Sequence, residues 1–182
     1  SPAVSSATPS YVYVARGALQ PLDDPQGSLK SALRTLSNAK LTSESWQPDV
    51  EALNDVRRLV VHHAGLLSDD RRLVQQIAEA ALKHVSSLRS SVSKTAMMAI
   101  EDMCFTMKRK MDPVVHQVIP PVLKRTVDTQ GFLRDAAEQT LLAVCRNCGC
   151  NRTLSALVGI STKGGKKIDA TQRAKAALCV SE

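Results

Sequence analysis

The stretch SSVSKTAMMAI, residues 90–100, decides the fold because two later stretches of the chain share its pattern. These are GFLRDAAEQTL at 131–141 and ATQRAKAALCV at 170–180. Val92 in the first stretch corresponds to Leu133 in the second, 41 residues further on. A chain that repeats one helical pattern at a fixed distance is built from stacked copies of one unit.

The repeat has a period of about 40 residues. Arg134 corresponds to Arg173 at a spacing of 39, and Val50 precedes Val92 by 42. Each unit has room for two helices, which is typical of HEAT and armadillo solenoids. We therefore predict an all-α fold, a short HEAT-repeat α-solenoid of about four helical hairpins. An unrelated helical bundle is the alternative.

Apolar residues follow the helical period from Ser28 onward, in eight segments. The fifth segment has Pro113 as its expected first residue. Pro120 and Pro121 lie inside it and should kink or split it. Gly149, after the sixth segment, is expected to be a C-terminal cap.

Residues 1–27 differ from the rest because they are rich in Ser, Pro and Gly. We predict an extended or partly disordered leader there, and a HEAT-repeat domain over 28–182 that is possibly incomplete at its C-terminal end. The leader contains YVYV, Tyr11 to Val14, which could either lie along a hydrophobic groove or be disordered.

Composition favours one globular domain that binds an acidic partner. Of 182 residues, 43% are hydrophobic and 23% charged, and no apolar run approaches the roughly 18 residues of a membrane helix. The net charge is +7, and residues 151–182 carry six Lys or Arg against two acids. Such a bias points to nucleic acid, an anionic membrane or an acidic protein surface, and charge alone does not choose among them.

Neither a metal site nor catalysis is indicated. Cys145, Cys148 and Cys150 form C-x-x-C-x-C, but no second cluster or spaced His pair accompanies them, so buried thiols are expected rather than zinc. Five Cys, an odd number, suggest reduced thiols in the cytoplasm. The stretch 159–167 has Gly165 where a phosphate-binding loop needs lysine. We predict no enzyme activity and no cofactor.

In stacked hairpins, all turns inside the pairs lie on one edge of the solenoid. Trp46, the only tryptophan, lies in the first such turn although its surroundings are polar. It could anchor a partner or fold back as a cover over the core. Arg89 could guide an acidic partner or only bind carbonyls at a helix end. The residues expected on or beside this edge are Trp46, Arg89, Lys94, Gln130, Arg134, Lys163, Lys166 and Lys167.

Three stretches resemble the TOG domain, a HEAT-repeat tubulin-binding module, and most closely the crescerin type, the TOG array regulators of axonemal microtubules. SESWQPDVEALNDVRRLVVHH (43–63) is similar to the first turn and second helix of that family. HVSSLRSSVSKTAMMAIEDMCFTMKRKMD (84–112) is similar to its second repeat, and GFLRDAAEQTLLAV (131–144) to its third. The likeness covers about residues 29–180.

The resemblance implies that Trp46 packs on the tubulin heterodimer and that Arg89, Lys94 and the lysines of the fourth turn meet its acidic surface. It implies a monomeric regulator of microtubule growth or stability in the cytoplasm and cytoskeleton, and possibly in the axoneme of cilia. Two departures matter: the family usually has six repeats, and the third turn, VDTQG, offers no cation of its own. The alternative is a HEAT-type scaffold that binds another acidic protein, or nucleic acid, through its basic edge.

Overall fold

The computed structural model describes residues 11–38 and 46–162, and every regular element in these ranges is helical. The α-helices are α1 Pro25–Asn38, α2 Gln47–His62, α3 Ala64–Ser68, α4 Arg71–Val85, α5 Ser90–Met107, α6 Val115–Arg125, α7 Gly131–Asn147 and α8 Cys150–Thr162. Two 3-10 helices are η1 Arg16–Ala18 and η2 Lys108–Val114. The eighth expected segment, 170–180, lies outside the described residues.

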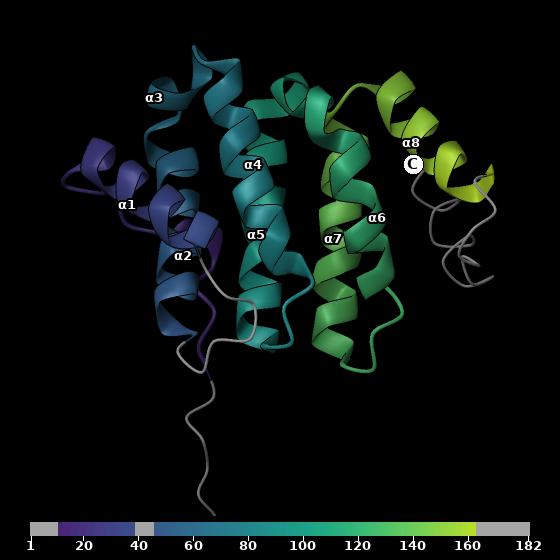
Figure 1. Cartoon of the computed structure of the whole chain (residues 1–182), viewed down its shortest axis with the longest axis horizontal. Coiled ribbons are helices and arrows are strands. Elements are labelled where there is room, and N and C mark those ends of the chain that lie inside the picture. The colour runs from purple at the N-terminus through teal and green to yellow at the C-terminus, as the bar shows by residue number, and fades with distance from the viewer. Residues whose placement is uncertain (1–10, 39–45, 163–182) are drawn as a thin grey trace, which may run out of the picture.

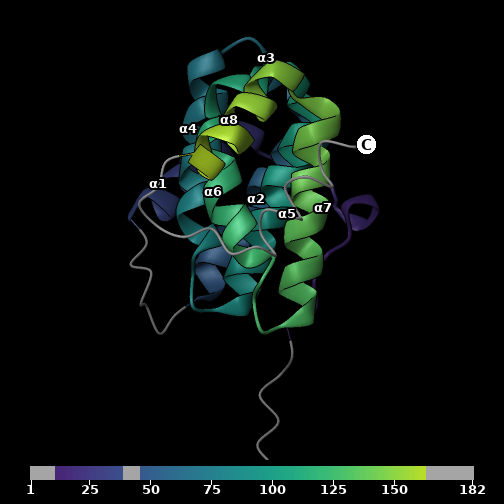
Figure 2. The same ribbon diagram turned by 90° about the vertical axis from the view of Figure 1, so that its right-hand side faces the viewer.

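The helices stack in two layers, as Figures 1 and 2 show. Helices α1, α4, α6 and α8 follow one another in one layer, and α2, α5 and α7 in the other. Three hairpins, α1 with α2, α4 with α5 and α6 with α7, connect the layers. The prediction of an all-α HEAT-type solenoid is therefore confirmed.

The core lies between the two layers and is formed by the positions that the repeat predicted. Val92 of α5 and the corresponding Leu133 of α7 are both 2% exposed. Leu53 of α2 and Ile100 of α5 are fully buried. Each such side chain contributes about 1.5–3 kcal/mol by leaving water, so the contacts between repeats hold the stack together.

Helix α1 begins at Pro25, three residues before the expected start at Ser28. The Asp24 carboxylate accepts a hydrogen bond of 2.9 Å from the backbone N–H of Gly27. Proline is well suited to the first helical position because its missing N–H would have no partner there. The division into a leader and a repeat domain stays a prediction.

Pro120 and Pro121 do not split α6, contrary to one expectation. The N–H groups that the prolines lack would have bonded the carbonyls of His116 and Gln117. His116 and Pro120 are exposed, so water can satisfy this side of the helix. Pro113 lies in η2 and not at the start of α6.

Gly149 is not the C-terminal cap of α7; that position is Cys148. The backbone N–H of Gly149 donates a hydrogen bond of 2.7 Å to Asp112 Oδ1, and a Cβ added at Gly149 would lie 2.7 Å from Asp112 Oδ2. The glycine therefore allows a close approach to the Asp112 side chain, and its backbone is not left-handed. None of the helices in the described ranges is long and apolar enough to cross a membrane.

Candidate functional site

We use the name turn edge for the side of the solenoid where the α4–α5 turn, the α6–α7 turn and the N-terminus of α2 lie. The α4–α5 turn, residues 86–89, and the α6–α7 turn, residues 126–130, lie there beside the N-terminus of α2 (Figure 1). The N-terminal ends of α2, α5 and α7 therefore point to the same edge, as the repeat predicted.

In the first turn, Trp46 is the N-cap residue of α2. Its side chain is half-buried and packs against the hydrophobic core. The Tyr11 ring meets it edge-on, with ring centroids 5.7 Å apart. Trp46 is thus partly a cover, and its remaining surface stays open at the edge. Whether this surface binds a partner stays a prediction.

The second turn presents two neighbouring side chains to solvent. Leu88 is 89% exposed, and Arg89, the N-cap residue of α5, is also exposed. The Arg89 guanidinium makes no hydrogen bond or ion pair within the described residues, so it is available to a partner. A hydrogen bond between the two flanking helices fixes this turn: Ser93 Oγ in the first turn of α5 donates to the carbonyl of Val85, the last residue of α4, at 2.6 Å.

The third turn has two cations that neighbour it, although its own sequence has none. Arg125, in the last turn of α6, makes an ion pair of 2.7 Å with Asp128. Arg134 donates to the carbonyls of Asp128 and Thr129 at 2.8 and 3.2 Å. The hydrogen bond from the Gln130 N–H is the largest cause that holds the pKa of Asp128 below its ordinary value. The hydrogen bond and the charge of Arg125 lower this pKa further. Gln130 is exposed.

Arg125 also joins the third turn to the second. Its Nε donates to the carbonyl of Val85 at 2.9 Å, and its NH2 to that of Ser87 at 2.7 Å. One guanidinium therefore fixes the distance between two turns of the edge.

Lys94 lies one turn inside α5 and faces aromatic rings. Its ammonium lies 4.2 Å from the centroid of the Tyr13 ring and 5.5 Å from that of Phe132. These are cation–π distances. Lys94 and Arg134 therefore have partners within the domain, whereas Arg89 is the more open cation. Lys163, Lys166 and Lys167 lie outside the described residues.

Sequence reasoning missed three apolar side chains at the edge. Leu88 in the second turn, and Val127 and Phe132 at the third, are 89%, 38% and 38% exposed. The signal that singled out Trp46, a large apolar residue in a polar turn, applies equally to Leu88 in SSLRSS. Together with Trp46 they place apolar surface in each of the three turns.

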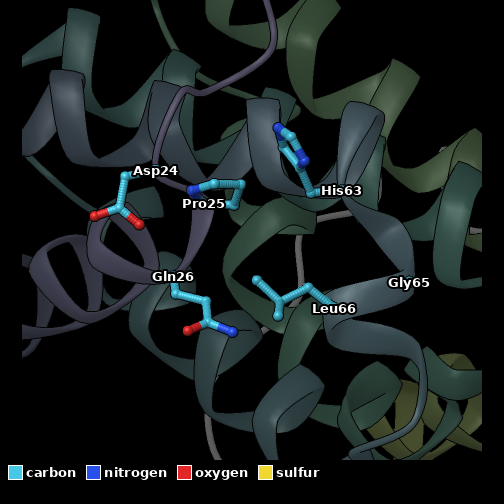
Figure 3. A pocket seen from close by; sticks show the side chains of 6 residues that line it. All are labelled: Asp24, Pro25, Gln26, His63, Gly65 and Leu66. Carbon is cyan, nitrogen blue, oxygen red and sulfur yellow. The ribbon is translucent and has the colours of Figure 1, made fainter.

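The edge opposite the turn edge has fewer candidate binding residues among those that the structure describes. Lys110 Nζ donates to the carbonyl of Ser68, the last residue of α3, as expected for a cation that complements a helix C-terminus. An open hollow near the start of α1 is shown in Figure 3. It is lined by Asp24, Pro25, Gln26, His63, Gly65 and Leu66. This set contains no nucleophile with a neighbouring base.

The cysteines of the described region show no metal-site geometry. A contact with Cys148, together with burial, raises the pKa of the Cys104 thiol well above its ordinary value, so it stays protonated. No group of three His, Cys, Asp or Glu within residues 11–38 and 46–162 could hold a metal ion. The absence of a metal from the whole protein remains a prediction.

Comparison with known proteins shows the family. The family model described as CLASP N terminal matches residues 26–168, which is well over half of the chain. The protein therefore belongs to the CLASP N-terminal family.

Curated relatives agree with this assignment. The chain is 28% identical over 155 residues to the TOG array regulator of axonemal microtubules protein 1 of Mus musculus, which covers 85% of this chain and 8% of that protein. It is 26% identical over 157 residues to the crescerin-like protein che-12 of Caenorhabditis elegans, covering 86% and 11%. Protein peg1 of Schizosaccharomyces pombe is 26% identical over 117 residues, covering 63% and 8%. The resemblance to a TOG domain of the crescerin type is thereby confirmed, and the chain spans about a tenth of these relatives.

Proposed function

We propose that the protein is a non-enzymatic, microtubule-associated domain that binds the tubulin heterodimer through the turn edge. The observation that carries this proposal is that two turns and the N-terminus of α2 lie at one edge, each with an apolar side chain, and that one cation there makes no hydrogen bond or ion pair within the described residues. Trp46, Leu88 and Phe132 represent the three turns, and Arg89 is the cation. The names of two relatives, which refer to axonemal microtubules and to crescerin, support this partner and a place in the cytoskeleton, including cilia.

The two kinds of side chain would act differently. Apolar anchors lose water when a partner covers them, so they supply most of the affinity. Cations around them steer an acidic partner into place and raise the association rate, an effect that salt screens. A net charge of +7 suits an acidic partner.

Purified tubulin tests the proposal when its affinity for the chain is measured beside a matched pair of variants. Arg89→Glu and Arg109→Glu each change the net charge by two units, and Arg109 is 82% exposed on the opposite edge. We expect Arg89→Glu to slow association several-fold at low salt and Arg109→Glu to have a much smaller effect. Leu88→Asp should weaken binding at every salt concentration.

The rival partners predict other results. A different acidic protein would leave tubulin unbound by the parent chain. Nucleic acid would bind with a steep salt dependence that Leu88→Asp leaves unchanged. Either result would contradict the proposal.

A further inference from the structure

Residues 11–22, which we call the strap, precede the part of the chain that the family model matches. The strap runs beside α2 and α5 and contacts α7, so it touches all three hairpins. In a solenoid each repeat otherwise contacts only its neighbours. Tyr13 and Val14 therefore contact the helices, whereas a hydrophobic groove along Tyr11 to Val14 stays a prediction.

A buried ion pair fixes the middle of the strap. Arg57 of α2, 1% exposed, bonds Asp102 of α5 at 2.7 Å through its Nε. Its NH1 donates to the carbonyl of Val14 at 2.7 Å. A buried guanidinium needs its donors satisfied, and a strap carbonyl satisfies one of them. Arg16 adds a bond of 3.0 Å to Thr106.

Two histidines at the end of α2 fix the far end of the strap. The Nε2 of His62 lies 2.7 Å from the carbonyl of Leu19, and the N–H of Leu22 donates to His63 Nε2 at 3.1 Å. Leu19 is 3% exposed. The path of the strap is thus determined by side chains along the length of α2.

The near end of the strap reaches the turn edge. The Tyr11 hydroxyl accepts a hydrogen bond of 2.8 Å from Asn54, and its ring packs on Trp46. The Tyr13 ring lies 6.3 Å from that of Phe132 and covers Lys94. Between the two tyrosines, Val12 is 81% exposed.

We infer that residues 11–13 of the strap form a further part of the partner-binding surface, in which Val12 contacts the partner and the two tyrosines are positioning residues. The inference rests on the proposed function and takes the same partner, an acidic protein surface that buries apolar side chains. The inference is supported because residues 11–13 are continuous with the turn edge. The Tyr11 ring contacts Trp46 of the first turn, and the Tyr13 ring lies near Phe132 at the third.

The test uses two variants of the full chain that add the same charge to the same segment. Val12→Asp places a carboxylate beside the turn edge, and Ala18→Asp places one at the far end of the strap. Ala18 lies in η1 and is exposed, so both variants should keep the melting temperature of the parent. We expect Val12→Asp to weaken tubulin binding roughly tenfold and Ala18→Asp to change it less than twofold.

Three further variants test the tyrosines. Tyr13→Ala should weaken tubulin binding several-fold, whereas Tyr13→Leu, which keeps apolar bulk, should recover part of the loss. Tyr11→Ala should shift the fluorescence emission of Trp46 to longer wavelength, because that indole then contacts more water. A role confined to stability would lower the melting temperature without changing the affinity of the folded protein.

The outcomes separate the inference from the function on which it rests. If Leu88→Asp weakens binding while Val12→Asp binds as tightly as Ala18→Asp, the strap inference is wrong and the turn edge stands. If the parent chain does not bind tubulin, the proposed function fails and the inference fails with it.

Discussion

Arg125→Met should destabilise the domain strongly, because one guanidinium joins two turns of the turn edge. Its Nε and NH2 bond the carbonyls of Val85 and Ser87, and its NH1 bonds Asp128. Methionine keeps part of the apolar stem and removes every donor. The variant therefore isolates the polar contacts from the packing.

The magnitude follows from how exposed each contact is. Hydrogen bonds from a charged group contribute about 1.5–3 kcal/mol each when buried. The Arg125 side chain is 19% exposed and that of Asp128 is 15% exposed, so solvent can replace part of each bond. An exposed ion pair adds about 0–1 kcal/mol. We expect a loss of roughly 2–4 kcal/mol in the free energy of unfolding, which lowers the melting temperature by roughly 4–16 °C.

Urea denaturation followed by circular dichroism gives the free energy, and Lys124→Met is the control. Lys124 is the exposed neighbour of Arg125 in the same helix, so its variant should lie within about 0.5 kcal/mol of the parent. If both variants have the same stability, Arg125 does not hold the two turns together and this reasoning is refuted.

Three further changes test other contacts of the fold by urea denaturation. Gly149→Ala should cost about 1–3 kcal/mol, because its Cβ would meet the Asp112 carboxylate at 2.7 Å; an unchanged stability would contradict this. Asp102→Asn should cost about 3–5 kcal/mol, since Arg57 would remain as an uncompensated buried charge, and a loss below about 1 kcal/mol would contradict it. The pKa of Asp128 is lowered from 3.8, so its stabilisation is present above that pH and is lost as the pH falls through the folded pKa. The parent should therefore lose its advantage over Asp128→Asn only as the pH falls below 3.8, and an advantage that is independent of pH would argue against this.

The fold could be predicted from the sequence because one helical pattern recurs about every 40 residues. Val92 and Leu133, which correspond 41 residues apart, are equivalent buried positions in successive hairpins. The uninterrupted course of α6 could not be predicted from Pro120 and Pro121 alone. It depends on which carbonyls the prolines leave without a donor and on their access to water.

The site was less predictable because its contacts join distant residues. The environment of Lys94 depends on Tyr13 in the strap and Phe132 in another hairpin, and no local pattern connects the three. The exposure of Leu88 was predictable only in part. Its exposure depends on the turn conformation, although its place between serines and arginine was a usable signal.

Hydrogen exchange of the full chain with and without tubulin tests the central claim most directly, because it reports where the partner covers the backbone. The account predicts slower exchange at 46–50, 86–90 and 126–132 on the turn edge, and no change at 63–70 and 108–114 on the opposite edge. Protection confined to the opposite edge, or no protection at saturating tubulin, would contradict it.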